Sequence, residues 1–121
     1  MKTILIAEDR DASRELLRTV LCAQGYRVVE ASDGLQALRK ADFELPDLFL
    51  LDLQMPELDG FEVARALRRD GRFAATPIIA LTASAMKGDR EKALAHGFSA
   101  YLSKPVRLAT LREEVLRWLP L

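Results

Sequence analysis

Cysteine is almost absent from this chain, and a single thiol, Cys22, excludes an internal disulfide. Charge of one sign is lacking too, because 18 lysines and arginines balance 18 aspartates and glutamates. A net charge of zero argues against nucleic acid or an anionic membrane as the main partner. No apolar run approaches the roughly 20 residues that a membrane-spanning helix needs.

The first residues do not have the pattern of a secretory leader. The apolar run at the amino terminus stops at Ala7 and meets acidic residues, a pattern unlike that of a signal peptide. A lone cysteine fits a reducing compartment, so we expect a soluble cytoplasmic protein. The 121 residues, of which 50% are hydrophobic and 30% charged, suit one globular domain spanning residues 1–121. The chain ends soon after its last predicted helix, a feature that favours a stand-alone protein or a trimmed domain.

Short apolar segments alternate with longer amphipathic ones along the chain. The short segments predict strands near residues 4–7, 28–29, 48–51, 78–81 and 100–102. The longer ones predict helices that include residues 11–24, 33–43, 84–95 and 107–119. Such alternation predicts an α/β fold, with a parallel sheet, right-handed crossovers and helices on both faces. A doubly wound sheet of five strands commonly has the flavodoxin-like order 2-1-3-4-5.

Polar residues follow the predicted strands. Glu8 and Asp9 follow the first strand, Asp52 ends the third, Thr82 ends the fourth and Lys104 follows the fifth. Ligands of doubly wound sheets bind beyond the carboxyl ends of the strands, where the strand order reverses. We therefore expect three carboxylates, one hydroxyl and one ammonium group at a single edge of the sheet.

The expected cluster suits phosphoryl chemistry. Neighbouring carboxylates raise one another's pKa, so a cation must be present if all three are ionised. Oxygen ligands without histidine or cysteine favour Mg²⁺ or Mn²⁺ over zinc. Asp52 closes the most apolar strand, and a carboxylate can attack phosphorus to form an acyl phosphate. Such transfer needs positioning and charge neutralisation, which the metal and Lys104 can supply while Thr82 hydrogen-bonds a phosphoryl oxygen.

Simpler interpretations of these residues stay open. An acid at a strand end can merely cap the helix that follows, and Thr82 can be the N-cap of the helix predicted over residues 84–95. Three arginines in the middle of the chain, Arg65, Arg68 and Arg69, are interpreted as a solvated helix face. Cys22 is expected to be a core or partly buried thiol.

Four motifs in order resemble the receiver domains of two-component response regulators and hybrid kinases. Glu8-Asp9 is similar to the acidic pair of that family, and the segment from Asp52 to Gly60 to its phosphoacceptor segment. Leu81-Thr82-Ala83 is similar to its switch hydroxyl motif, and the segment from Tyr101 to Pro105 to its lysine motif. The resemblance covers nearly the whole chain, from Lys2 to about Leu119.

The resemblance implies roles for the acidic residues. Asp52 would be the phosphorylated residue. Asp9, Asp52 and the backbone carbonyl of Gln54 would bind Mg²⁺ or Mn²⁺, with Glu8 helping through water. Two positions depart from the family pattern: Glu8 stands where aspartate is commoner, and Arg10 places a cation at the rim of the site where a neutral residue is frequent.

The resemblance also implies roles for residues of the last two strands. Lys104 would contact the phosphoryl group, and Thr82 would move toward it. Tyr101 would swing inward as Thr82 moves, and Pro105 would follow a cis peptide bond. By analogy with the family, Gln54 and Ser84 would tune the lifetime of the phosphorylated state.

The function implied is that of a signalling phosphoacceptor that assists its own phosphorylation and dephosphorylation. A sensor histidine kinase or a histidine phosphotransfer domain would donate the phosphoryl group, and a downstream protein would read the switched conformation. A phosphatase or phosphotransferase of small molecules is the rival. Such enzymes usually carry an aspartate where Gln54 stands, and 121 residues leave no room for their cap. A nucleotide-binding fold is a third possibility, but no glycine-rich loop follows the first strand.

Two surfaces are expected to carry the signal. The output surface would lie over residues 84–119, where Ala85, Met86, Ala93 and Leu94 accompany Lys87, Arg90 and Lys92. The donor would dock at the start of the first helix, around Arg10, Ala12, Ser13 and Arg14, because its histidine must come within bonding range of Asp52.

Overall fold

The computed structural model describes residues 1–83 and 88–121, so expectations for Ser84, Ala85, Met86 and Lys87 lie outside the described residues. The strands are β1 (Thr3–Ala7), β2 (Arg27–Ala31), β3 (Leu48–Asp52), β4 (Ile78–Thr82) and β5 (Ala100–Ser103). The helices are α1 (Asp11–Ala23), α2 (Gly34–Glu44), α3 (Gly60–Arg69), α4 (Asp89–Ala95) and α5 (Leu108–Trp118), with a short 3-10 turn, η1 (Gly71–Phe73). Within the described part of the chain, none of the helices combines the length and apolar character that crossing a bilayer requires.

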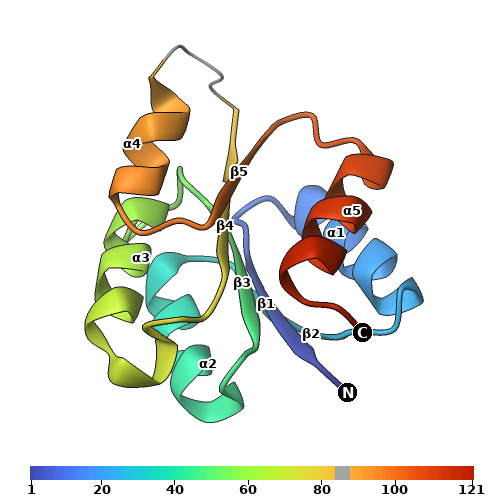
Figure 1. Ribbon diagram of the computed structural model, residues 1–121, viewed down its shortest axis with the longest axis horizontal. Helices are drawn as coiled ribbons and strands as arrows, with labels where there is room; N and C mark the ends of the chain where they lie inside the picture. Colours follow the sequence, from blue (N-terminus) through green and yellow to red (C-terminus); the bar gives the residue numbers. More distant parts are fainter. Residues whose placement is uncertain (84–87) are drawn as a thin grey trace.

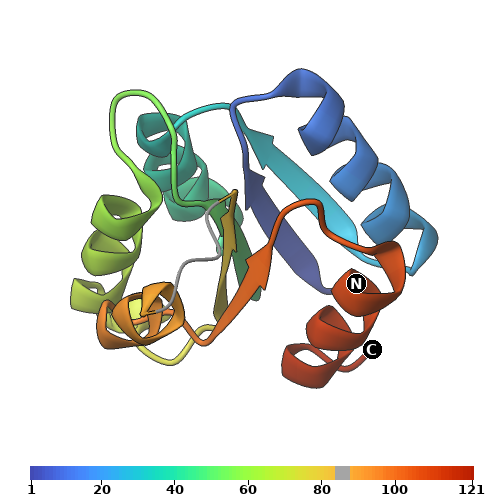
Figure 2. The ribbon, with the colours of Figure 1, turned by 90° about the horizontal axis from the view of Figure 1, so that it is seen from above.

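The five strands form one parallel sheet in the order β2-β1-β3-β4-β5, which confirms the predicted fold. Helices α1 and α5 cover one face of the sheet, and α2, α3 and α4 cover the other (Figure 1). The view from above shows the two helical layers on opposite sides of the strands (Figure 2). Helices α1 and α2 therefore lie on opposite faces of the sheet, and the strand order reverses between β1 and β3, at its centre.

Strand β3 shows why the central segments are continuously apolar. Phe49 and Leu51 face the core beneath α2 and α3, whereas Leu48 and Leu50 face the core beneath α1 and α5. All four side chains are fully buried. A strand buried on both faces needs apolar side chains at every position. Asp52 interrupts this run at the last residue of the strand, so its backbone is held by the most buried element of the protein.

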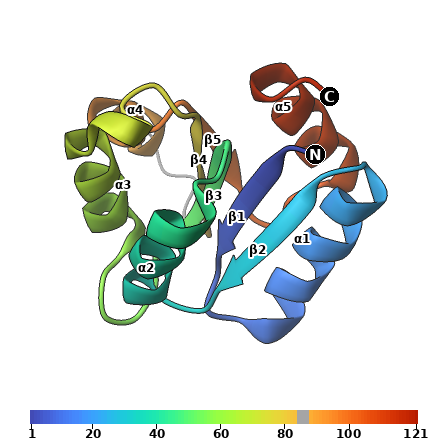
Figure 3. The same cartoon turned by 90° about the horizontal axis from the view of Figure 1, so that it is seen from below.

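The register of the strands sets the position of each polar residue along the strand direction. Ala7 of β1 pairs with Leu51 of β3, and therefore Glu8, the next residue, is level with Asp52. Asp52 in turn pairs with Leu81 of β4, so Thr82 lies one residue beyond it. Seen from below, the carboxyl ends of the central strands meet at one edge of the sheet (Figure 3).

Arg68 does not belong to a solvated face, so that interpretation was wrong for this residue. Its guanidinium group donates hydrogen bonds to the carbonyl oxygens of Gly97 at 2.8 Å, Phe73 at 2.8 Å and Thr76 at 2.7 Å. The other two arginines of the cluster are exposed, as expected. Arg68 is half-buried because it satisfies carbonyl groups of two loops. The loop before β4 follows it closely along the chain, and the loop before β5 is reached 29 residues later.

Two further local expectations change. The helix predicted over residues 84–95 is described from Asp89, and its N-cap is Gly88, with a φ of 96°, so Thr82 is not the N-cap of α4. Cys22 is exposed, which contradicts the expected burial. Leu21 and the other buried residues of α1 take the inner face of that helix, so Cys22 is left on the outer side.

Candidate functional site

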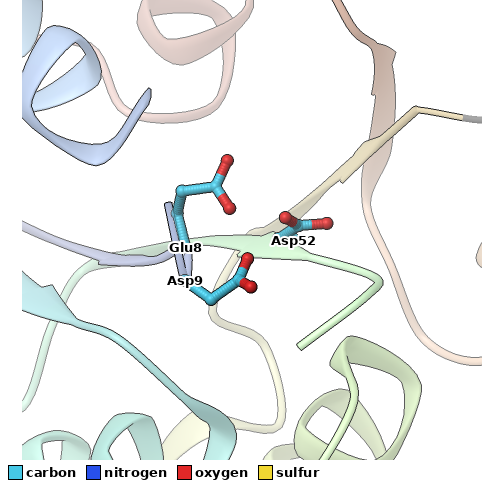
Figure 4. Close-up of side chains that lie close together, drawn as sticks. All are labelled: Glu8, Asp9 and Asp52. Atoms are coloured by element: carbon cyan, nitrogen blue, oxygen red, sulfur yellow. The ribbon is translucent and has the colours of Figure 1, made fainter. Parts of the chain in front are cut away.

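Three carboxylates meet at the carboxyl edge of the sheet. Glu8 and Asp9 follow β1 and Asp52 ends β3, and one carboxylate oxygen from each lies within 4.8 Å of the others. The three side chains point toward a common space (Figure 4). Glu8 is 0% exposed and Asp52 is 4% exposed, whereas Asp9 lies at the surface. The structure thus brings the three acids together as the sequence predicted, with one of them open to solvent.

Lys104, the residue after β5, contacts two of these carboxylates. Its Nζ lies 2.6 Å from Oε1 of Glu8 and 2.9 Å from Oδ2 of Asp52. Its backbone amide donates to the carbonyl oxygen of Thr82 at 2.7 Å, which fixes the chain just after β5. The Lys104–Pro105 peptide bond is cis. A buried ion pair of this kind needs each partner, because removing one leaves an uncompensated charge.

Electrostatics shifts the pKa values of the two buried acids in opposite directions. Burial raises the pKa of Glu8 to about 7, and its hydrogen bond with Asp52 adds to the rise while Lys104 opposes it. Burial also acts to raise the pKa of Asp52, but hydrogen bonds with Glu8, Lys104 and the backbone amide of Gln54 outweigh it and lower that pKa. The pKa of Lys104 is raised, since the two carboxylates outweigh the effect of burial. The pKa values of the two acids are thus shifted in opposite directions, which favours a proton on Glu8 over one on Asp52.

The donor set fits a divalent metal ion that prefers oxygen. Within the described residues, Oε2 of Glu8 is buried without a hydrogen-bond partner, a costly state that a nearby cation would relieve. Asp9 and Asp52 supply further carboxylate oxygens in the same space. The backbone amide of Gln54 donates to Oδ1 of Asp52 at 3.0 Å, so the chain turns directly beside the cluster. Carboxylate and carbonyl oxygens are ligands suited to Mg²⁺ and Mn²⁺.

A cavity of about 190 Å³ opens over these groups. Its lining residues lie at or just beyond the ends of four strands and are Asp9, Arg10, Asp52, Gln54, Ala83 and Lys104. Thr82 is 3% exposed and lines a different cavity, of about 290 Å³, together with Leu53 and Gln54. Tyr101 is half-buried in β5, level with Ala80 of β4. The structure therefore gathers four of the predicted metal and phosphoryl residues, Asp9, Asp52, Gln54 and Lys104, in one cavity. Glu8 lines a neighbouring cavity of about 380 Å³, and Thr82 and Tyr101 do not line the cavity over Asp52.

Two supporting residues had no such role in the sequence-based prediction. Arg14 of α1 donates to the backbone carbonyl of Glu8 at 2.9 Å and so ties the helix to the acidic pair. Gly60 lies so close to β3 that a Cβ there would stand 2.5 Å from the carbonyl oxygen of Asp52. The position of Arg14 in the first turn of the helix that follows the acidic pair could have indicated its contact with that pair. Nothing local marked the close approach at Gly60.

Comparison with known proteins agrees with this geometry. The response regulator receiver domain family matches residues 4–116 of the chain. The polar-differentiation response regulator DivK of Brucella anthropi is 39% identical over 118 residues, which is 98% of this chain and 96% of that protein.

Solved structures show the same fold. The chemotaxis response regulator CheY4 of Vibrio cholerae superposes with a TM-score of 0.93 at 32% identity, covering 98% of this chain and 99% of that one. The receiver domain of the sensor histidine kinase PA1611 of Pseudomonas aeruginosa, solved with a magnesium ion in its active site cleft, gives 0.89 at 39% identity, covering 97% and 96%. The chain therefore belongs to the response regulator receiver domain family, the phosphoacceptor modules of two-component signalling.

Proposed function

We propose that residues 1–121 form one receiver domain in which Asp52 accepts the phosphoryl group. The observation that carries this proposal is the environment of Asp52. It is an almost fully buried carboxylate with a lowered pKa, and Lys104 lies 2.9 Å from its Oδ2. A nucleophile must be ionised, and the phosphoryl group that it receives must be neutralised. Asp52 and Lys104 meet these two requirements within one cavity.

The proposed reaction transfers a phosphoryl group without a net change of protons on the acceptor. An oxygen of Asp52 attacks phosphorus, and the bond from phosphorus to the donor nitrogen breaks. The donor imidazole leaves with the bonding electron pair, and Asp52 becomes an acyl phosphate. Lys104 holds a phosphoryl oxygen throughout the transfer. In this sense the domain assists its own phosphorylation, and hydrolysis of the acyl phosphate reverses the state.

A divalent metal, Mg²⁺ or Mn²⁺, is part of the proposal. Asp9, Asp52 and the carbonyl oxygen of Gln54 would hold it directly, and Glu8 through water. The bound ion would neutralise charge on the phosphoryl oxygens during transfer. Support comes from the three clustered carboxylates and from the magnesium ion in the receiver domain of PA1611.

Receiver domains interact with histidine kinases and with downstream targets, and we propose the same classes of partner here. The donor would be a sensor histidine kinase or a histidine phosphotransfer domain, and the output a downstream protein rather than nucleic acid or a membrane. The donor would dock at the start of α1. Arg10 and Ser13 line a cavity of about 380 Å³ there, together with Leu16 and Leu108. The cytoplasmic location expected from the sequence remains part of this proposal.

Phosphorylation in solution tests the proposal. Acetyl phosphate with millimolar Mg²⁺ should add one phosphoryl group to the protein, as seen by intact mass, and EDTA should prevent the addition. Titration with Mg²⁺ alone should shift the amide signals of Asp9, Asp52 and Gln54. Trp118 is a poor fluorescence reporter of this binding because it lies at the end of α5, where its indole donates to Glu114. Labelling that is equally fast in EDTA would contradict the metal site.

We also propose that Thr82 and Tyr101 transmit the phosphorylated state to α4. Thr82 is buried at the end of β4, and the cavity that it lines reaches Asp89 and Lys92 of α4. Motion of Thr82 toward the phosphoryl group would empty space that Tyr101 can enter. Helix α4 would then shift against α3, to which it is joined by Phe61, whose ring lies 4.9 Å from both His96 and Nζ of Lys92.

Amide shifts can test this route of transmission. Addition of beryllofluoride with Mg²⁺ should shift the signals of Thr82, Tyr101 and α4 more than those of Val28 and α2. The reason is that β2 and α2 lie at the opposite edge of the sheet from β5. A response confined to the metal ligands would show that the site stores a phosphoryl group without signalling through α4.

A further inference from the structure

Arg10 lies where two cavities meet. The cavity of about 190 Å³ above Asp52 and the cavity of about 380 Å³ beside α1 share three lining residues, Arg10, Ala83 and Lys104. The smaller cavity is lined mostly by polar groups, and the larger one also by apolar residues of α1 and the segment leading into α5. A molecule that approaches Asp52 from the larger cavity must therefore pass Arg10.

The other cations beside the acidic cluster are already engaged. Lys104 is bound to Glu8 and Asp52. Arg14 donates to Asp11 at 2.7 Å and to Glu30 at 3.3 Å, in addition to the carbonyl oxygen of Glu8. Arg10 is exposed and, among the residues that the structure describes, forms no ion pair. Its charge is thus available to an anion that enters the cavity.

The local structure gives no reason for an arginine at this position. Arg10 is the N-cap of α1, and its side chain makes no capping hydrogen bond. Serine, threonine, asparagine and aspartate are the residues that favour an N-cap. A positive charge at this end of a helix also opposes the helix dipole. A residue that breaks local rules without a local gain is a candidate for a functional role.

We propose that Arg10 determines which phosphodonors reach Asp52: it favours small acyl phosphates that carry two negative charges, and it weakens the binding of divalent metal at the same site. This inference rests on the proposed function of Asp52. The transfer itself is balanced as before, since an oxygen of Asp52 bonds to phosphorus, the bond to the acyl oxygen breaks, and the carboxylate leaves with the electron pair. Arg10 acts on the approach of the donor through its charge.

Coulomb's law sets the size of the effect. A cation roughly 7 Å from a dianion in a medium close to water raises the rate of productive encounter by about three- to tenfold, and salt screens part of this attraction. The same charge repels Mg²⁺ by a similar factor. Removal of Arg10 should therefore slow phosphorylation and tighten metal binding. General damage to the site would weaken both functions and would not produce this combination.

The experiment compares Arg10→Gln with the parent at saturating Mg²⁺. The rate constant for acetyl phosphate should fall three- to tenfold at low salt, and the rate constant for phosphoramidate, which is less negatively charged at neutral pH, should fall less. The dissociation constant for Mg²⁺, from amide shifts, should fall several-fold. Arg10→Lys should restore most of the parent behaviour. Arg18→Gln is the matched control, because it removes the same charge from a residue of α1 that pairs with Glu30 outside the two cavities.

Outcomes separate this inference from the proposed function. If the parent is labelled and Arg10→Gln slows both donors equally, or weakens Mg²⁺ binding, the selective role of Arg10 is wrong. An Arg18→Gln variant that behaves like Arg10→Gln would show a general effect of net charge and would also overturn it. If no variant and no parent protein takes up a phosphoryl group, the proposed function of Asp52 fails instead.

Discussion

Asp52→Asn should abolish uptake of a phosphoryl group from acetyl phosphate in the presence of Mg²⁺, with intact mass as the measurement. Asparagine has the shape of aspartate but lacks the ionised oxygen that attacks phosphorus. The pKa of Asp52 is lowered and its Oδ2 lies 2.9 Å from Nζ of Lys104, and both features favour the ionised carboxylate. We expect the loss to be complete. Glu8 is also buried beside Lys104, but its pKa is raised to about 7 whereas that of Asp52 is lowered, and Asp9 lies at the surface.

The matched control for this variant is Asp42→Asn. Asp42 is an exposed carboxylate of α2 that pairs with Arg72 at 2.6 Å. Its loss should leave labelling unchanged, because surface ion pairs contribute about 0–1 kcal/mol to stability and this one is outside the cavity. Circular dichroism should show that both variants are folded. Labelling of Asp52→Asn at the rate of the parent would mean that another residue is the acceptor.

Gly60→Ala should lower the free energy of unfolding by about 3 kcal/mol and slow phosphorylation as well. The added Cβ would stand 2.5 Å from the carbonyl oxygen of Asp52 and 2.9 Å from the Cα of Leu53. These are backbone atoms of the strand end that carries the nucleophile, so they cannot rotate away. Either the first turn of α3 or the end of β3 must move. Urea unfolding and the rate of labelling by acetyl phosphate measure the two effects.

Gly71→Ala is the control for Gly60→Ala. A Cβ at Gly71 would meet no atom within 4 Å. We expect its unfolding free energy to differ from that of the parent by about 0.5 kcal/mol or less, as for most surface substitutions. Equal stability of the two alanine variants would show that α3 can retreat from β3 without cost. In that case the contact at Gly60 would not be what positions Asp52.

The fold could be predicted from the sequence because its evidence is local. Each buried strand is a short apolar run, and each helix presents a stripe of apolar residues at helical spacing. Alternation of the two leaves few topologies for a parallel sheet, so the strand order followed. The acids at the ends of β1 and β3 could then be placed at one edge, because parallel strands end on the same side. For these residues, position along the chain was enough to predict proximity.

The state of the site depended on contacts between distant segments. Glu8 and Asp52 have similar intrinsic pKa values, and burial acts to raise both. Hydrogen bonds of Asp52 with Glu8, Lys104 and the backbone amide of Gln54 lower the pKa of Asp52, whereas that of Glu8 stays raised. The sequence predicted a surface position for Arg68, but its guanidinium donates to carbonyl groups of a nearby loop and to that of Gly97, 29 residues away. Such acceptors carry no mark in the sequence, since every residue has a carbonyl group.

The sequence by itself determined the order of the strands, the chemical types at their ends and hence the family. Tertiary structure alone decided that the pKa values of Glu8 and Asp52 shift in opposite directions, that Gly60 lies against the end of β3, and that Arg10 lines two neighbouring cavities. The physical reason is the distance along the chain over which each interaction acts. Hydrophobic periodicity is set by neighbours along the chain, whereas charge, burial and close approach in this site are set by residues up to 96 positions apart, as for Lys104 and Glu8.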